Sequence, residues 1–235
     1  MKILITILLI FNFGISYSQD YKIGDNLFVN AYGGLNLRNE PNSKSIVIEL
    51  LSYGDTVVVK AKSNEKEEVV INGMNGNWVE VFTDNNRGFA FDAYLTKLPI
   101  IEVNANPGEF CFFNVMNDYI SNRIGIVDTT YYNNGSDGEG YHNMKIFQLK
   151  GGHQYIEHSY WESYEYEIQL NKIRDCEGIQ LIKNLFQVCD KLSDESENKL
   201  TDIGSYHNIE IGESWYSILI RKFDDMFIIK IMGGP

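Results

Sequence analysis

The strongest constraint on the fold is a series of short β-prone runs between Leu35 and Leu95, each closed by turn residues. Pro41, Gly54 and the Asn72-Gly73 pair are typical turn residues. Short strands at such close spacing are typical of a small barrel or sandwich. The runs are Leu35–Arg38, Ile46–Leu51, Thr56–Val59, Val69–Ile71, Trp78–Phe82 and Gly88–Phe91.

Alternation along these runs separates an inner face from an outer one, because successive side chains of a strand point to opposite sides. Trp78 and Glu80 are predicted to point outward, where an aromatic ring can serve as a platform for an apolar or peptide ligand. An alternative is that Trp78 and Tyr94 seal the end of the barrel or contact the second half of the chain. The predicted core consists of Leu35, Leu37, Val57, Val59, Val79 and Val81.

Four motifs in this region, in this order, resemble the bacterial SH3 domain family. They are Leu35-Asn36-Leu37-Arg38 with Pro41, Gly54-Asp55 with Val57 and Val59, Trp78-Val79 with Val81, and Gly88-Phe89 with Phe91, Tyr94 and Leu95. The resemblance covers residues 23–97 and departs from the family's short form between Val59 and Trp78, where an extended hairpin around Val69–Ile71 is expected.

The resemblance implies an SH3-like barrel that binds cell-wall peptide or another envelope component. The ligand groove would include Trp78, Glu80, Tyr94 and Arg38. The predicted function is binding without catalysis, and the partner is not a nucleic acid, because the formal net charge of −12 is offset by no basic run.

Residues 1–18 have the pattern of a signal peptide. Lys2 supplies a positive charge, an apolar run follows from Ile3 to Ile15, and Ser16 and Ser18 fit the small-residue requirement for cleavage. The mature chain is therefore expected to begin at Gln19. It would be periplasmic or extracellular, with no insertion into a membrane after cleavage.

The rest of the chain is predicted to form a linker at 98–108 and an α+β domain at 109–235, so that the fold class is mainly β. This domain would be an antiparallel sheet packed on one main helix, from Cys176 to Leu192, with Asp175 as its N-terminal cap. It resembles no family that we recognise. Its expected strands are Glu109–Val115, Met144–Leu149, Ser163–Leu170, Ser205–Ile211, Trp215–Lys222 and Met226–Met232.

The three cysteines restrict the possible disulfides. Cys176 and Cys189 both fall in the predicted helix, where a rise of ~1.5 Å per residue separates them by roughly 19 Å along the axis. A disulfide needs Cα atoms within about 7 Å. Any bridge is therefore expected to join Cys111 to one of the other two.

The segment Asp175-Cys176-Glu177-Gly178-Ile179 resembles the Asp-Cys-Ser-Gly-hydrophobic signature of NlpC-type cell-wall cysteine peptidases. A cysteine at a helix N-terminus has a lowered thiol pKa and can act as a nucleophile. Glu177, however, replaces the serine, and its charge opposes formation of the thiolate. A peptidase using Cys176 and His207 is one alternative to the binding protein, and purely structural pairing of the two domains is another.

Metal and cofactor sites are not predicted. The four histidines lack the spacing of zinc ligands. The segment from Asn133 to Glu139 is rich in oxygen ligands but fails the EF-hand pattern, because Met144 occupies the position of the last ligand. We interpret it as an exposed loop.

Overall fold

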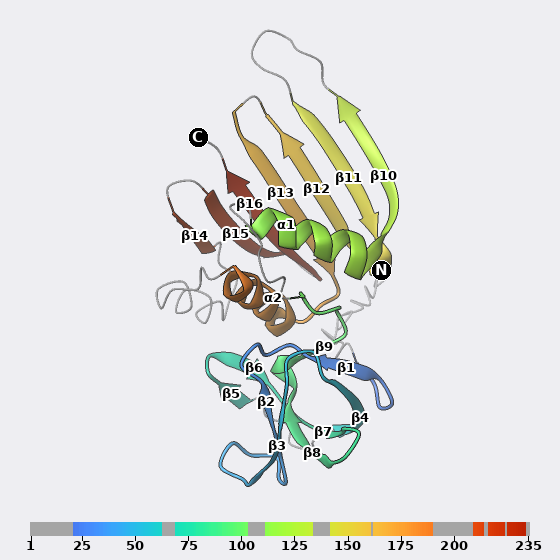
Figure 1. Ribbon diagram of the computed structural model, residues 1–235, viewed down its shortest axis with the longest axis vertical. Coiled ribbons are helices and arrows are strands. Elements are labelled where there is room, and N and C mark those ends of the chain that lie inside the picture. Colours follow the sequence, from blue (N-terminus) through green and yellow to red (C-terminus); the bar gives the residue numbers. More distant parts are fainter. Residues whose placement is uncertain are drawn as a thin grey trace, which may run out of the picture.

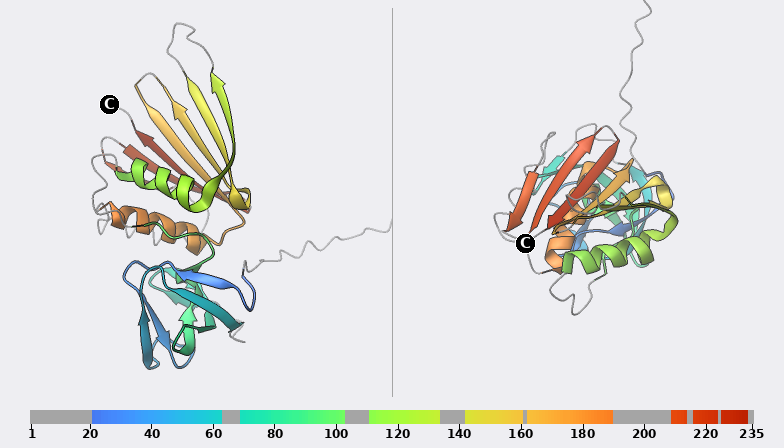
Figure 2. Two further views of the ribbon diagram at one scale, coloured as in Figure 1. Left: turned by 45° about the vertical axis from the view of Figure 1, so that its right-hand side comes forward. Right: turned by 90° about the horizontal axis from the view of Figure 1, so that it is seen from above.

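The computed structural model describes residues 21–62, 69–102, 111–133, 142–160, 162–189, 209–213, 216–223 and 225–233. The expected leader, the start of the mature chain at Gln19, the loop from Asn133 onward and His207 lie wholly or mostly outside these residues. The described chain is mainly β, with a small barrel followed by a larger sheet that carries two helices on one face (Figures 1 and 2).

The barrel is a seven-stranded antiparallel sheet in the order β3-β2-β8-β7-β4-β1-β9. The predicted strands of the barrel are confirmed within a few residues. The expected hairpin is present as a separate two-stranded sheet of β5 and β6. Its turn lies at Asn72 and Gly73, whose φ angles are 50° and 74°. The elements are β1 (Asn26–Val29), β2 (Leu35–Arg38), β3 (Val47–Leu51), β4 (Thr56–Lys62), β5 (Val69–Ile71), β6 (Met74–Gly76), β7 (Trp78–Phe82), β8 (Arg87–Phe91), the 3-10 turn η1 (Asp92–Tyr94) and β9 (Leu95–Thr96).

All six side chains predicted for the barrel core are buried. Trp78 points outward from the barrel core, as predicted, but it is not accessible to a ligand, because the residue is only 4% exposed. Alternation does send Trp78 and Val79 to opposite sides of β7, but both sides are covered. Val79 lies in the barrel core, whereas Trp78 lies in a second core that the barrel shares with the rest of the chain.

The second domain is a seven-stranded antiparallel sheet in the order β10-β11-β12-β13-β16-β15-β14. Both helices lie on the same face of this sheet (Figure 1). Its elements are α1 (Cys111–Asp118), the π-helical turn η2 (Tyr119–Gly125), β10 (Ile126–Asn133), β11 (Asn143–Leu149), η3 (Lys150–Gly152), β12 (Gln154–Ser159), β13 (Tyr164–Asn171), α2 (Asp175–Val188), β14 (Ile209–Glu213), β15 (Tyr216–Phe223) and β16 (Met226–Gly233).

One predicted strand is wrong, because the segment expected as a strand at Glu109–Val115 forms helix α1 from Cys111. The residues buried here are Cys111, Val115, Met116, Tyr119 and Ile120, which follow one face of a helix, whereas the adjacent pairs among them would point to opposite faces of a strand. The expected strands near Met144, Tyr164, Tyr216 and Met226 are confirmed, and β14 covers the described part of the one expected at Ser205–Ile211.

Helix α2 lies between the sheet and the barrel, with the sheet on one side and η1 and β6 on the other (Figure 1). Burial from both sides explains why even Gln180, Lys183 and Asn184 are buried in this helix. The predicted N-terminal cap, Asp175, is wrong, because Asp175 is the first residue of the helix. Arg174 is the N-cap residue, and the Glu177 carboxylate accepts the backbone N–H of Arg174 at 3.1 Å, which satisfies a donor that the helix leaves free.

A disulfide joins Cys111 at the start of α1 to Cys189 at the end of α2, with Cα atoms 5.7 Å apart. This confirms that Cys176 and Cys189 are not bonded to each other and that the bridge uses Cys111. Cys176 is free and buried. The bridge fixes the two helices to each other on one face of the sheet.

Candidate functional site

The four residues predicted for the ligand groove lie in different surroundings. Trp78 and Tyr94 both pack against Phe91, with ring centroids 5.8 and 5.9 Å away. Glu80 is half-buried and forms an ion pair with Arg87.

Arg38 is also half-buried, and its Nη1 donates to the carbonyl oxygen of Ser45 at 2.6 Å. The structure therefore brings two of the four together, Trp78 and Tyr94. It gives each of the other two a local partner on the barrel.

The aromatic cluster of Trp78, Phe91 and Tyr94 belongs to the joint between the two domains. Trp78 and Phe91 are buried in the same apolar core as Ile179 and Ile182 of α2, and Tyr94 packs against that core. Leu98 and Ile101, in the segment expected as a linker, are also buried there. This side of the barrel is therefore an internal interface.

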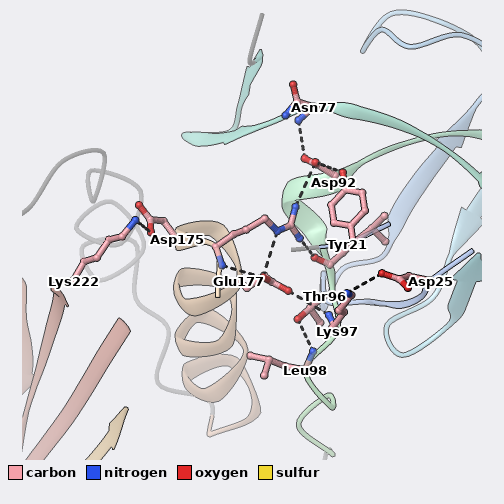
Figure 3. Close-up of polar contacts among 12 residues, drawn as sticks. Tyr21, Asp25, Asn77, Asp92, Thr96, Lys97, Leu98, Asp175, Glu177 and Lys222 are labelled. Atoms are coloured by element: carbon pink, nitrogen blue, oxygen red, sulfur yellow. Dashed lines mark hydrogen bonds and ion pairs between the residues drawn. The ribbon is translucent and has the colours of Figure 1, made fainter. Parts of the chain in front are cut away.

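A buried ionic network crosses the joint beside this core (Figure 3). Its centre is the guanidinium of Arg174, which donates through Nη2 to the Leu95 carbonyl oxygen at 2.5 Å. Nη1 lies 3.4 Å from Oδ2 of Asp92, and Nε lies 3.3 Å from Oε2 of Glu177. One cation thus bridges a carboxylate of the barrel and one of α2.

Asp92 is 1% exposed, and each of its oxygens has partners. Oδ1 accepts the backbone N–H of Asn77 at 2.7 Å, and Oδ2 accepts the phenol of Tyr21 at 2.5 Å. The Tyr21 ring also lies under the Arg174 guanidinium, 5.0 Å from its centroid. Burial, together with the Asp92 charge, raises the pKa of Tyr21 above its ordinary range, so that the phenol remains a donor.

Polar residues of α2 complete the joint. Glu177 Oε1 accepts the backbone N–H of Lys97 at 3.3 Å. Two turns further along, Asn184 Nδ2 donates to the carbonyl and side-chain oxygens of Asn30 at 2.9 and 2.8 Å, and Gln180 donates to Asn184 at 3.0 Å. The contacts of Glu177 and Asn184 with the barrel form only when the helix and the barrel are correctly aligned, so they specify how the domains dock. The Gln180 bond lies within the helix, and Gln180 Oε1 has no partner among the described residues.

Cys176 does not have the surroundings of a nucleophile. Its side chain is 8% exposed, and burial raises the pKa of the thiol to about 12; the Glu177 charge adds to the shift and the Arg174 charge opposes it. A thiol with such a pKa carries almost no thiolate at neutral pH. Its proposed partner, His207, lies outside the described residues.

The barrel also has an apolar row that faces solvent, on strand β3 and the residue before it, at one end of the barrel sheet. Ile46, Ile48 and Leu50 are 72%, 40% and 63% exposed. Val47 is 44% exposed as well, whereas Leu51 is buried. Sequence reasoning missed these exposed residues because every position from Ile46 to Leu51 except Glu49 is apolar, so the run shows no alternation.

The described residues contain no group of three or more histidine, cysteine or carboxylate side chains suited to holding a metal ion. Two histidines do meet: Nε2 of His142 lies 3.0 Å from Nδ1 of His158, and the ring of Tyr160 stacks on His142 at 4.6 Å. Burial lowers the pKa of His158. In the part of the chain that the structure covers, no helix is both long enough and apolar enough to span a membrane.

The fold and its exposed strand define a small SH3-like barrel built into a larger α+β protein. Residues 33–96 match the family model of the bacterial SH3 domain, the family that the four sequence motifs resemble. No curated protein and no solved structure matches the chain.

Proposed function

We propose that this protein is an exported, non-catalytic binding protein whose SH3 domain holds cell-wall peptide or another envelope component. The observation that carries the proposal is the exposed apolar row of Ile46, Ile48 and Leu50 on a barrel of this family. Bacterial SH3 domains often bind cell-wall components. The apparent leader at residues 1–18 supports a location outside the cytoplasm.

The position of the ligand surface follows from what the second domain covers. The aromatic side of the barrel, with Trp78 and Phe91, is buried against α2 and is not accessible to a ligand. The row on β3 is accessible, and exposed apolar side chains in a row are characteristic of interaction sites. The Arg38 guanidinium lies beside the start of this row, because its Nη1 donates to the carbonyl oxygen of Ser45, the residue before Ile46.

The burial of Cys176 and the raised pKa of its thiol support a binding role over a catalytic one. A cell-wall cysteine peptidase needs an accessible thiolate beside a histidine, whereas this thiol is buried in the joint with a pKa raised to about 12. The same side chain fits a packing role at the start of α2.

Retention on isolated peptidoglycan tests the proposal. We expect the wild-type protein to sediment with peptidoglycan and the double variant Ile48→Ser with Leu50→Ser to remain in the supernatant. Ile23→Ser is the matched control, because Ile23 is 68% exposed elsewhere on the barrel. Equal retention of the double variant and the wild type would contradict the assignment of the surface.

A structural role for the barrel is the second candidate, and the continuous core across the joint favours it. In that case the barrel holds α2 against the sheet and has no ligand. The wild-type protein would then show no retention on peptidoglycan, although substitutions in the joint would still destabilise the sheet domain.

A further inference from the structure

Two histidines meet on the face of the large sheet that turns away from the helices. Both helices lie on the other face (Figure 1), where Tyr155 of β12 is buried in the core. His158 is three positions further along the same strand, so its side chain points to the opposite face. There, Nε2 of His142 lies 3.0 Å from Nδ1 of His158, and both residues are half-buried. A small ion can therefore reach this pair of nitrogens.

Neighbouring side chains hold the two imidazole rings in place. The ring of Tyr160 stacks on that of His142, with centroids 4.6 Å apart and planes within 2° of parallel. Oε1 of Glu165 lies 3.8 Å from Nε2 of His158, the ring nitrogen that does not face His142. Lys230 forms an ion pair with the same carboxylate at 2.7 Å. A carboxylate beside the second nitrogen of the ring is the usual surrounding of a metal-binding histidine.

A methionine supplies a third possible ligand. In the register of β11 with β12, Met144 lies directly opposite His158, so both side chains leave the same face of the sheet. Such a pair has Cβ atoms about 4.5–5.5 Å apart, and the flexible side chain of methionine can turn its sulfur toward a neighbour. Within the parts of the chain that the structure describes, no third histidine, cysteine or carboxylate completes the pair. The donor set is therefore two imidazole nitrogens and one thioether sulfur.

We propose that His142, His158 and Met144 form a binding site for a copper(I) ion. A thioether is a soft ligand that selects Cu(I), and imidazole also suits copper, whereas hard cations prefer oxygen ligands. A metal ion bound to both nitrogens at ~2.0 Å would hold them about 3.3–3.5 Å apart. The observed 3.0 Å is close to this separation, so the rings need to move only slightly to admit the ion.

Charge and protonation favour a cation at this site. Burial lowers the pKa of His158, and the Glu165 charge opposes the shift, so the ring is neutral and can act as a ligand at neutral pH. The charged groups that act on this ring are Glu165, Glu167 and Lys230. The formal net charge of −12 also attracts cations to the protein. Because protons compete for both nitrogens, copper binding should weaken as the imidazoles become protonated at acidic pH.

Competition with bicinchoninate for Cu(I), under anaerobic conditions with ascorbate, measures the affinity. We expect the wild-type protein to take a single Cu(I) per chain from the coloured bicinchoninate complex. His142→Asn and His158→Asn should each weaken binding about a hundredfold, and Met144→Leu, which conserves volume, about tenfold. Met226→Leu is the matched control, since Met226 is a half-buried methionine at the start of β16. Cys176→Ala is a second control, because this thiol is buried.

X-ray absorption at the copper edge identifies the ligands themselves. The wild-type protein and both controls should show one sulfur and two nitrogen neighbours, and Met144→Leu should lose the sulfur. Thermal melts without copper verify that each variant is folded. A wild-type protein that takes no Cu(I) from bicinchoninate would overturn the proposal. So would histidine variants that bind Cu(I) as tightly as the wild type, or a sulfur neighbour that persists in Met144→Leu.

Discussion

Nη1 of Arg174 lies 3.4 Å from Oδ2 of Asp92, and this contact joins the N-cap of helix α2 to a buried carboxylate of the barrel. The two side chains are 16% and 2% exposed. Burying either charge alone would be costly, so the two domains must meet in one orientation for both charges to be paired. The joint is therefore specified by charge as well as by apolar packing.

The contribution of this pair is measured by replacing Arg174 with alanine. Removal of the cation leaves Asp92 buried with only its Asn77 and Tyr21 hydrogen bonds, and we expect the free energy of unfolding to fall by about 3–5 kcal/mol. Urea denaturation followed by circular dichroism gives this value. The control is Lys222→Ala, because Lys222 pairs with Asp175 at 2.5 Å but both side chains are solvent-accessible, so a loss of ~1 kcal/mol or less is expected. Equal losses for the two variants would contradict the role given to the joint.

Gly178 provides a test in which packing opposes helix propensity. A Cβ at this position would lie 2.4 Å from a ring carbon of Phe227, which is buried in the sheet. Gly178→Ala should gain about 1 kcal/mol of stability through its higher helix propensity. Overpacking should cost more than this, so we expect the free energy of unfolding to fall by roughly 1–2 kcal/mol in total. In Gly33→Ala the new methyl group has no neighbour within 4 Å, and little change in stability is expected. A stabilised Gly178→Ala variant would show that α2 does not lie this close to β16.

The buried thiol of Cys176 makes a prediction about pH. Because its pKa is raised from 9.0 to about 12 in the folded protein, its contribution to stability is complete below pH 9 and is lost as the pH rises from 9 toward 12. The wild-type protein should therefore lose stability relative to Cys176→Ala between pH 9 and 10, by up to about 1.4 kcal/mol per pH unit. Urea denaturation at each pH measures the difference.

Labelling with a thiol reagent gives an independent check on the same residue. At pH 8 the native protein should react with Ellman's reagent far more slowly than the urea-unfolded protein. Rapid labelling of native Cys176 would mean an accessible thiolate and would revive the peptidase alternative.

The disulfide between Cys111 and Cys189 spans 78 residues of chain and should stabilise the folded state mainly by restricting the unfolded one. We expect the double variant Cys111→Ser with Cys189→Ser to lose about 4 kcal/mol. Reduction of the wild-type protein should have a similar effect, and reduction of the double variant should have none. A double variant as stable as the oxidised wild type would contradict this account.

The sequence predicts the barrel well because its strands alternate between a core side and a polar side and end at turn residues. It also predicts α2, and helix geometry excludes a bond between Cys176 and Cys189. Helix α1 was missed because a short apolar segment such as Cys111–Val115 fits either a strand or one face of a helix. Only the packing against α2 and the sheet selects the helix.

The joint was beyond sequence reasoning for a different reason. Alternation identifies the inner face of the barrel, but it gives no sign that a distant helix covers part of the outer face, where Trp78 lies. The polar contacts of the joint connect positions far apart in the chain, such as Asn30 with Asn184 and Tyr21 with Asp92. No local pattern indicates which buried polar residue will meet which.

The central claim of this account is that the barrel and the sheet domain form one cooperative unit through α2. Native-state hydrogen exchange in increasing urea, read by mass spectrometry, tests it most directly. Amides of β7 in the barrel and of β13 in the sheet should become exchangeable with the same midpoint and the same dependence on urea, and Arg174→Ala should shift both. Opening of β7 at a urea concentration where β13 remains fully protected would contradict the claim.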